Sequence, residues 1–214
     1  MNLILLGPPG AGKGTQAVLI AEAFGLLHLS SGDILRAERK EKTELGLKAQ
    51  AYMDRGDLVP DDVILTMMVE HIAGARDRKG FLLDGFPRTL AQAQGLKTRL
   101  EEAETRLDHV ISLEVDDAEL VTRLTGRLYC PDCGRTYHEK FSPPQTAGAC
   151  DVNGEKLLRR KDDTPEVVRQ RLETYHRETK PLIAYYGAQG LLRSVSGVGE
   201  IDDVASRIKE ACKA

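Results

Sequence analysis

A glycine-rich run with a single lysine, GPPGAGKGT from Gly7 to Thr15, carries the clearest chemical signal in the chain. Glycines let the backbone turn its amide groups inward around an anion, and the start of a following helix adds partial positive charge. Lys13 can then reach the outer phosphates as a point charge. A glycine-rich turn with a chance lysine is the alternative. The apolar run before it and the helical pattern after it favour a phosphate-binding loop for a nucleoside triphosphate.

The residue after the lysine departs from the usual pattern. Most such loops place Ser or Thr there, and its hydroxyl binds Mg²⁺, whereas this chain has Gly14. We therefore expect Mg²⁺ to depend on water and on carboxylates such as Asp84, at the end of the run FLLD, or Asp33.

Arginines form a second candidate group. Guanidinium groups bind phosphate oxygens through paired hydrogen bonds. For any single arginine, a surface position or a structural ion pair is the default. Several near predicted strand ends, where open α/β sheets bind ligands, favour a phosphate site as a set. These residues are Arg36, Arg88, Arg123, Arg127, Arg160 and Arg171.

Three cysteines suggest a metal clip. Cys130 and Cys133 have the spacing of a zinc knuckle, Cys150 opens a second half, and Asn153 stands where a fourth thiolate would fall. Three thiolates carry enough negative charge to hold Zn²⁺, with the Asn153 carbonyl, Asp151 or a water completing the tetrahedron. We expect a structural zinc, and a reduced, metal-free hairpin is the alternative.

Strands that alternate with helices must position these groups. The runs NLILLG, LLHLSSGD, FLLDG, HVISLEV and LLRSVSG predict five buried strands, separated by stretches of helical spacing. This alternation predicts an α/β fold of the P-loop NTPase type, with a parallel five-stranded sheet flanked by helices. Two segments break the rhythm, a charged helical stretch near 31–59 and the clip near 127–160. We interpret both as insertions at strand ends.

Composition limits the partners. The 214 residues have a net charge of −3 and a pI near 6.0, which gives no reason to expect nucleic acid or an anionic membrane as a partner. No apolar run approaches the ~20 residues of a membrane span. Cysteine usage is not that of a disulfide framework, so we expect a reducing cytoplasm. No long apolar stripe remains unassigned, which favours a monomer.

Several motifs together resemble one family over essentially the whole chain. GPPGAGKGT, SSGDILR, GDLVPDDV, LLDGFPRT, GRLYCPDCGRTYH, FSPP, RKDD and RQRL occur in the order and rough spacing of bacterial adenylate kinases of the long-lid type. The resemblance implies reversible transfer of the γ-phosphoryl group from Mg-ATP to AMP, giving two ADP. It also implies a CORE domain (1–29, 60–126 and 162–214) and two mobile inserts. These are an NMP-binding insert (30–59) and a LID insert (127–161) that carries the clip.

The resemblance assigns roles position by position. Ser31 stands where the family usually has threonine and keeps the hydroxyl, and Gln92 can pair with an adenine edge. The implied ATP-binding residues are Gly10, Ala11, Gly12, Lys13, Gly14, Thr15, Arg123, Arg127, Thr136, Tyr137 and Val198. The implied AMP-binding residues are Ser31, Arg36, Asp57, Leu58, Val59, Gly85, Phe86, Pro87, Arg88, Gln92, Arg160 and Arg171. The implied catalytic residues are Lys13, Asp84, Arg88, Arg123, Arg160 and Arg171.

Two other functions remain open at this point. A kinase specific for UMP or CMP would keep the same loop and arginines, but its lid is usually short and lacks cysteines, and Gln92 favours adenine. A zinc-ribbon interaction module fused to a nucleotide sensor would need a basic or aromatic-rich face. Only 5% of the residues are aromatic, which argues against that module.

Overall fold

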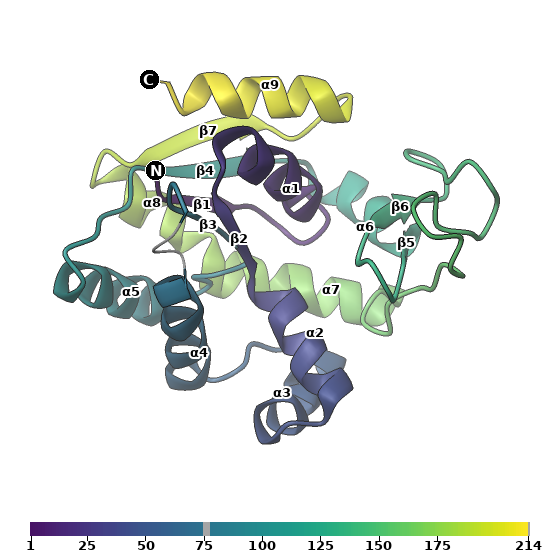
Figure 1. Cartoon of the computed structure of the whole chain (residues 1–214), viewed down its shortest axis with the longest axis horizontal. Helices are drawn as coiled ribbons and strands as arrows, with labels where there is room; N and C mark the ends of the chain where they lie inside the picture. The colour runs from purple at the N-terminus through teal and green to yellow at the C-terminus, as the bar shows by residue number, and fades with distance from the viewer. Residues whose placement is uncertain (75–77, 214) are drawn as a thin grey trace.

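The computed structural model describes residues 1–74 and 78–213 and is centred on one parallel sheet (Figure 1). The strand order is β2-β3-β1-β4-β7, and every neighbouring pair is parallel. All five strands coincide with the predicted apolar runs, so the predicted α/β fold with a parallel five-stranded sheet is confirmed. The strands are β1 (Leu3–Leu6), β2 (Leu27–Ser30), β3 (Phe81–Asp84), β4 (His109–Glu114) and β7 (Leu192–Ser196).

Helices cover both faces of this sheet. One face packs against α1 (Lys13–Phe24), α6 (Asp117–Thr125), α7 (Pro165–Thr174) and α9 (Ile201–Ala211). The other packs against α4 (Asp61–Ala73), α5 (Leu90–Glu102) and α8 (Pro181–Gly187). A π-helical turn, Tyr175–Thr179, joins α7 to α8, which begins at Pro181. Across the described residues, no helix combines the length and apolar character of a membrane span.

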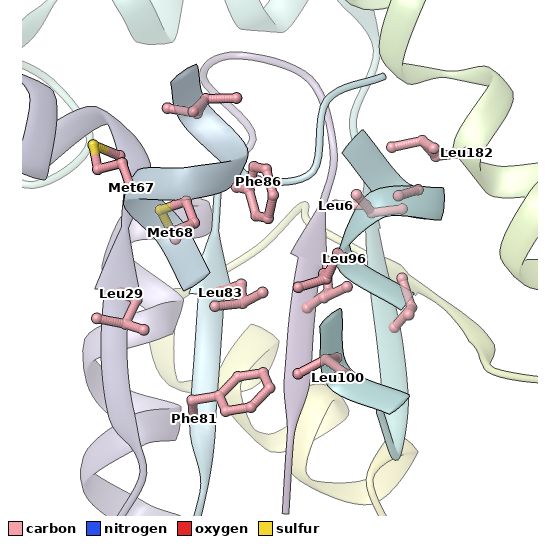
Figure 2. Close-up of a cluster of buried hydrophobic side chains, with 14 of the residues drawn as sticks. Leu6, Leu29, Met67, Met68, Phe81, Leu83, Phe86, Leu96, Leu100 and Leu182 are labelled. Atoms are coloured by element: carbon pink, nitrogen blue, oxygen red, sulfur yellow. The ribbon is translucent and has the colours of Figure 1, made fainter. Parts of the chain in front are cut away.

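The central strand β1 shows why apolar runs located the sheet. Leu3 and Leu5 belong to the cluster on the α1 side, and Ile4 and Leu6 to the cluster on the α5 side. Figure 2 shows Leu6 on the α5 side of the sheet, within the cluster to which α4 and α5 also contribute. A strand buried on both faces has no polar alternation, so it appears in the sequence as a continuous apolar run.

Two parts of the chain project from this sheet. Helices α2 (Ser31–Glu41) and α3 (Glu44–Arg55) lie at the bottom of Figure 1, and the antiparallel hairpin of β5 (Arg127–Tyr129) and β6 (Thr136–His138) lies at the right. They fall within the segments interpreted as insertions. The exact limits of the inserts and their mobility stay predictions.

Helices α2 and α3 approach too closely at Gly46 for any side chain. A Cβ built on Gly46 would lie 2.3 Å from the carbonyl carbon and oxygen of Glu38. Because this neighbour is backbone, we expect Gly46→Ala to lower the free energy of unfolding by about 1–3 kcal/mol in urea denaturation. Gly187→Ala is the matched control, since its nearest contact would be an ordinary 3.8 Å to Leu192. Equal stability of the two variants would contradict the close packing.

Candidate functional site

The glycine-rich loop links β1 to α1 at the carboxyl end of the sheet. Gly10 and Gly12 have φ of 87° and 90°, a left-handed conformation that side chains other than glycine rarely adopt. Lys13 starts α1, and its Nζ donates to the carbonyl oxygens of Gly7 (2.7 Å) and Pro8 (2.8 Å). The loop therefore curls around its own lysine, and the binding of phosphate by its amides stays a prediction.

A cleft of about 550 Å³ of empty space lies beside this loop. It is lined by Lys13, by Gly56 and Leu58 after α3, and by loop 85–88 after β3. Arg171 of α7 lies on its wall. The cleft opens at the carboxyl ends of adjacent strands, where doubly wound sheets bind ligands.

Positive charge is crowded in the cleft. Burial lowers the pKa of Lys13 to about 8; Asp84 opposes this shift, while Arg88 and Arg171 add to it. Burial and the neighbouring Arg171 lower the pKa of Arg88 to about 10. Burial, with Arg127 nearby, lowers the pKa of Arg160 to about 9. Lys13, Arg88 and Arg160 therefore stay cationic at neutral pH, and a bound polyanion would relieve their repulsion.

Two carboxylates that sequence analysis did not assign hold the arginines in place. Asp163, 8% exposed, accepts from Arg127 (Nε–Oδ2 2.8 Å, Nη2–Oδ1 2.5 Å) and from Arg171 (Nη1–Oδ1 3.0 Å). Asp162 lies 3.0 Å from Arg171 as well. The motif RKDD carried the signal, paired acids beside a cluster of arginines. Thr164, not Asp163, caps α7, so the Asp163 carboxylate is available to bind the two arginines.

Hydrogen bonds fix the loop after β3. Ser31 Oγ and Arg88 Nε both donate to the carbonyl of Gly85, each at 2.6 Å. The amide nitrogen of Arg88 donates to Oε1 of Gln92 at 2.7 Å, and the Gln92 side chain is 2% exposed. Phe86 and Pro87, joined by a cis peptide bond, complete the loop. Ser31, residues 85–88 and Gln92, all expected around AMP, therefore lie together.

The cysteines meet in the hairpin region. The Sγ atoms of Cys130, Cys133 and Cys150 all lie within 4.8 Å of one another, and the Cys133–Cys150 pair is 3.5 Å apart. Zn–S bonds of about 2.3 Å in a tetrahedron need sulfurs about 3.8 Å apart, so these three thiols could bind zinc. Although burial opposes its ionisation, hydrogen bonds from Tyr137 and nearby backbone amides lower the pKa of Cys150 to about 6. The thiolate that metals bind is thus favoured.

Two similar turns hold the candidate ligands. Gly134 donates to the carbonyl of Cys130 at 3.0 Å, and Gly154 donates to that of Cys150 at 2.8 Å. Asn153 therefore occupies in the second turn the place of Cys133 in the first, and its Oδ1 lies 3.6 Å from Cys130 Sγ.

Asp151, the other candidate side chain, and the nearby His138 form hydrogen bonds outside the cysteine cluster. The Asp151 carboxylate accepts from the amide of Gln145 at 2.8 Å. His138 accepts from two backbone amides through Nδ1, and its Nε2 lies 3.2 Å from the carbonyl of Thr122.

Comparison with known proteins identifies the family. A family model described as Adenylate kinase matches residues 5–191. The adenylate kinase of Carboxydothermus hydrogenoformans is 50% identical over 211 residues, which are 99% of each chain. Those of Citrifermentans bemidjiense and Geobacter sp. are 52% and 51% identical over 214 residues, with both chains fully covered. The chain belongs to the adenylate kinase family. The enzyme class expected from the motifs, a nucleoside monophosphate kinase of the adenylate kinase type, is therefore confirmed.

The adenylate kinase residues expected on the ATP side lie in two places. Arg123 on α6 pairs with Glu119 and donates to the carbonyl of Gly197 at 3.2 Å, beside the half-exposed Val198. Thr136 and Tyr137 lie on β6, and the Tyr137 hydroxyl is 3.4 Å from Cys150 Sγ. The Tyr137 ring therefore packs inside the hairpin region.

Of the remaining residues expected around AMP, Arg36 and Arg160 meet at one carboxylate near the start of α2. Arg36 pairs with Asp33, and Arg160 lies 3.9 Å from the same carboxylate. Asp57 is bonded to Arg55 at 2.9 Å, whereas Val59 is buried in the hydrophobic core. Asp33 thus lies between an arginine of α2 and one that follows the hairpin.

Asp84 lies where a carboxylate was expected near magnesium. It ends β3, is 7% exposed, and its Oδ2 lies 3.8 Å from Nε2 of His28. A Cβ on Gly14 would be 3.5 Å from that same oxygen, so the carboxylate lies against the first turn of α1. Mg²⁺ usually takes one or two carboxylates and keeps several waters, and this donor set fits it.

Proposed function

We propose that phosphoryl transfer between Mg-ATP and AMP, giving two ADP, takes place in the cleft between the phosphate loop and loop 85–88. The main support is that Lys13, Arg88 and Arg171 converge on one cleft at the carboxyl ends of β1 and β3. Two polyphosphates can share one cleft only where cations offset their mutual repulsion.

Each substrate has its own side of the cleft in this proposal. The triphosphate of ATP lies on the amides of loop 10–15 with Lys13, and Arg123, Arg127, residues 136–137 and the backbone at Val198 hold the rest of the nucleotide. AMP lies between α2 and loop 85–88. Its contacts are Ser31, Arg36, the backbone of residues 57–59, loop 85–88, Gln92, Arg160 and Arg171.

The reaction needs positioning rather than a base. A phosphate oxygen of AMP, already anionic, attacks the γ-phosphorus, and the bond from that phosphorus to the β–γ bridging oxygen breaks, leaving ADP with the electron pair. Lys13 and the arginines neutralise charge on the transferred group, and Asp163 pre-positions two of them, Arg127 and Arg171. Bound Mg²⁺ would supply further charge neutralisation, and Asp84 would hold it through water.

Closure of two inserts would complete the site. Residues 30–59 and 127–161 would open to exchange nucleotides and close to exclude water, which strengthens every charge interaction inside. The approach of Arg160 to Asp33, 3.9 Å, supports contact between the two segments in the closed form.

We propose that zinc staples the LID segment. Cys130, Cys133 and Cys150 would be three ligands and the Asn153 carbonyl the fourth, at a site far from the transferred phosphate. The chain is expected to act as a monomer in the cytoplasm, without nucleic-acid or membrane partners.

Direct product analysis tests the proposed reaction. The purified chain is mixed with Mg-ATP and AMP, UMP or CMP, and the nucleotides are separated by chromatography over time. We expect ADP to form from ATP and AMP, with initial rates for UMP and CMP lower by roughly 10²-fold or more. Similar rates with a pyrimidine monophosphate would refute the base assignment, and no transfer to any monophosphate would refute the reaction.

Affinity for ATP should depend on pH through Lys13. Without nucleotide its pKa is about 8, and bound phosphates favour the charged form. Below pH 8 the lysine is already protonated, whereas above it binding must take up a proton. The Kd of ATP should therefore rise by up to roughly tenfold per pH unit above pH 8. Isothermal titration between pH 7 and 9.5 measures this rise. If the ATP Kd of Lys13→Met rose with pH as steeply as that of the parent, Lys13 would not be the titrating group.

A further inference from the structure

Asp61 links the two loops that line the monophosphate side of the cleft. It is the first residue of α4 and directly follows the segment 57–59. Its Oδ1 reaches the start of α5, where it accepts from Gln92 Nε2 at 2.7 Å and from Thr89 Oγ1 at 3.0 Å. The carboxylate thus joins the N-termini of two helices that are separate in the sequence.

These contacts fix the orientation of the Gln92 amide. Oε1 accepts from the backbone N–H of Arg88 at 2.7 Å, and Nε2 donates to Asp61. A backbone N–H can only donate and a carboxylate can only accept, so a flipped amide would face two mismatched partners. The two hydrogen-bond partners therefore determine which atom of the Gln92 side-chain amide is the oxygen and which is the nitrogen.

The locked amide keeps one donor and one acceptor for a ligand. An amide NH₂ has two hydrogens and the carbonyl oxygen has two lone pairs, and the protein uses one of each. Adenine presents its 6-amino donor beside a ring-nitrogen acceptor, a pattern that a glutamine amide matches with both groups. On the edge that carries N1, a 6-oxopurine presents an N1–H donor and an O6 acceptor, the reverse of the N1 acceptor and 6-amino donor of adenine, and only a flipped amide would match it.

We propose that Asp61 is a positioning residue that sets the base preference of the monophosphate site by holding Gln92 in the orientation that fits adenine. This inference rests on the proposed function, in which Gln92 contacts the base of AMP. Thr89 Oγ1 donates to Asp61 and also accepts from the backbone N–H of Gln92 at 3.1 Å.

Base discrimination measures this role directly. For each variant, kcat/KM is determined for AMP and for inosine monophosphate, a 6-oxopurine, at saturating ATP. Asp61→Ala is expected to lower the AMP to inosine monophosphate ratio roughly tenfold, about one hydrogen bond's contribution, through a higher KM for AMP. The KM for ATP should stay at the parent value. Asp61→Asn keeps an acceptor at the Oδ1 position and should restore the parent ratio.

Thr89→Val separates this role from helix capping. It removes the cap of α5 and one bond to Asp61, but leaves the bond from Gln92 to Asp61 intact. We expect a lower melting temperature with the parent discrimination ratio. If Asp61→Ala does not fold, Asp61→Ser replaces it, since a serine hydroxyl stops short of the Oδ1 position.

The outcomes distinguish the inference from the proposed function. An unchanged ratio in folded Asp61→Ala, or an equal fall in Thr89→Val, would overturn the inference while leaving AMP as the substrate. A parent chain that phosphorylates neither monophosphate would overturn the proposed function and, with it, this inference.

Discussion

Lys13→Met should lower kcat for ADP formation by roughly 10³-fold, between the cost of losing one oxyanion donor and that of losing an arginine finger. Methionine keeps the unbranched apolar stem and removes the charge. The Lys13 ammonium group now bonds two carbonyls of its own loop at 2.7 and 2.8 Å. When phosphates enter, we expect it to exchange these neutral partners for anionic oxygens that gain charge during transfer. The loss should therefore appear mainly in kcat.

Initial rates at saturating ATP and AMP measure the effect. Lys97→Met is the matched control, because that lysine lies on α5, is more than half exposed and faces solvent. It should keep the parent kcat. Thermal melting of both variants checks that the loop still folds. A kcat for Lys13→Met within tenfold of the parent would show that the arginines alone carry the transferred charge.

The sequence predicted what depends on short-range patterns. Strand β1 is buried on both faces, so its apolar run identified it without further context. The conformation of the phosphate loop is likewise determined by residues adjacent in the sequence, namely glycines and a lysine directly before a helix. The repeated turn that aligns Asn153 with Cys133 also follows from spacing, because each turn closes within a few residues.

What the sequence left open depends on pairs far apart in the chain. Asp163 holds Arg127 across 36 positions, and Asp61 holds Gln92 across 31. Such pairings follow from how helices pack, which spacing alone does not specify. The sequence also could not predict which way the Tyr137 side chain points. It lies on a strand of three residues, too short for an alternating pattern to reveal which side faces inward.

Removal of zinc should destabilise the LID segment more than any single substitution in its interior. The buried cluster there contains Cys130, Tyr137, Cys150 and Leu157, with Leu128 packed against it, which is a small core for about 35 residues. We expect the purified chain to carry one zinc per molecule by atomic absorption. Treatment with a strong chelator should lower the melting temperature and make the peptide bonds of 127–161 the first cut by trypsin. Cys133→Ser should lose the metal, whereas Cys212→Ser, outside the cluster, should keep it.

The fourth ligand can be tested by changing the charge at Asn153. Asn153→Asp places a carboxylate in the same turn, and Zn²⁺ binds an anionic oxygen more strongly than a neutral amide, so zinc affinity should rise by roughly tenfold or more. Asn153→Ala removes the oxygen and should weaken binding by a similar factor, measured by competition with a chromophoric chelator. If Asn153→Ala kept the parent affinity, the Asn153 amide would not be a ligand, and water or Asp151 would complete the tetrahedron. Asn153→Asp is the sharper test. If Asn153 only packs beside the thiolates, 3.6 Å from Cys130, the new carboxylate would repel them instead of binding the metal. Affinity would then fall.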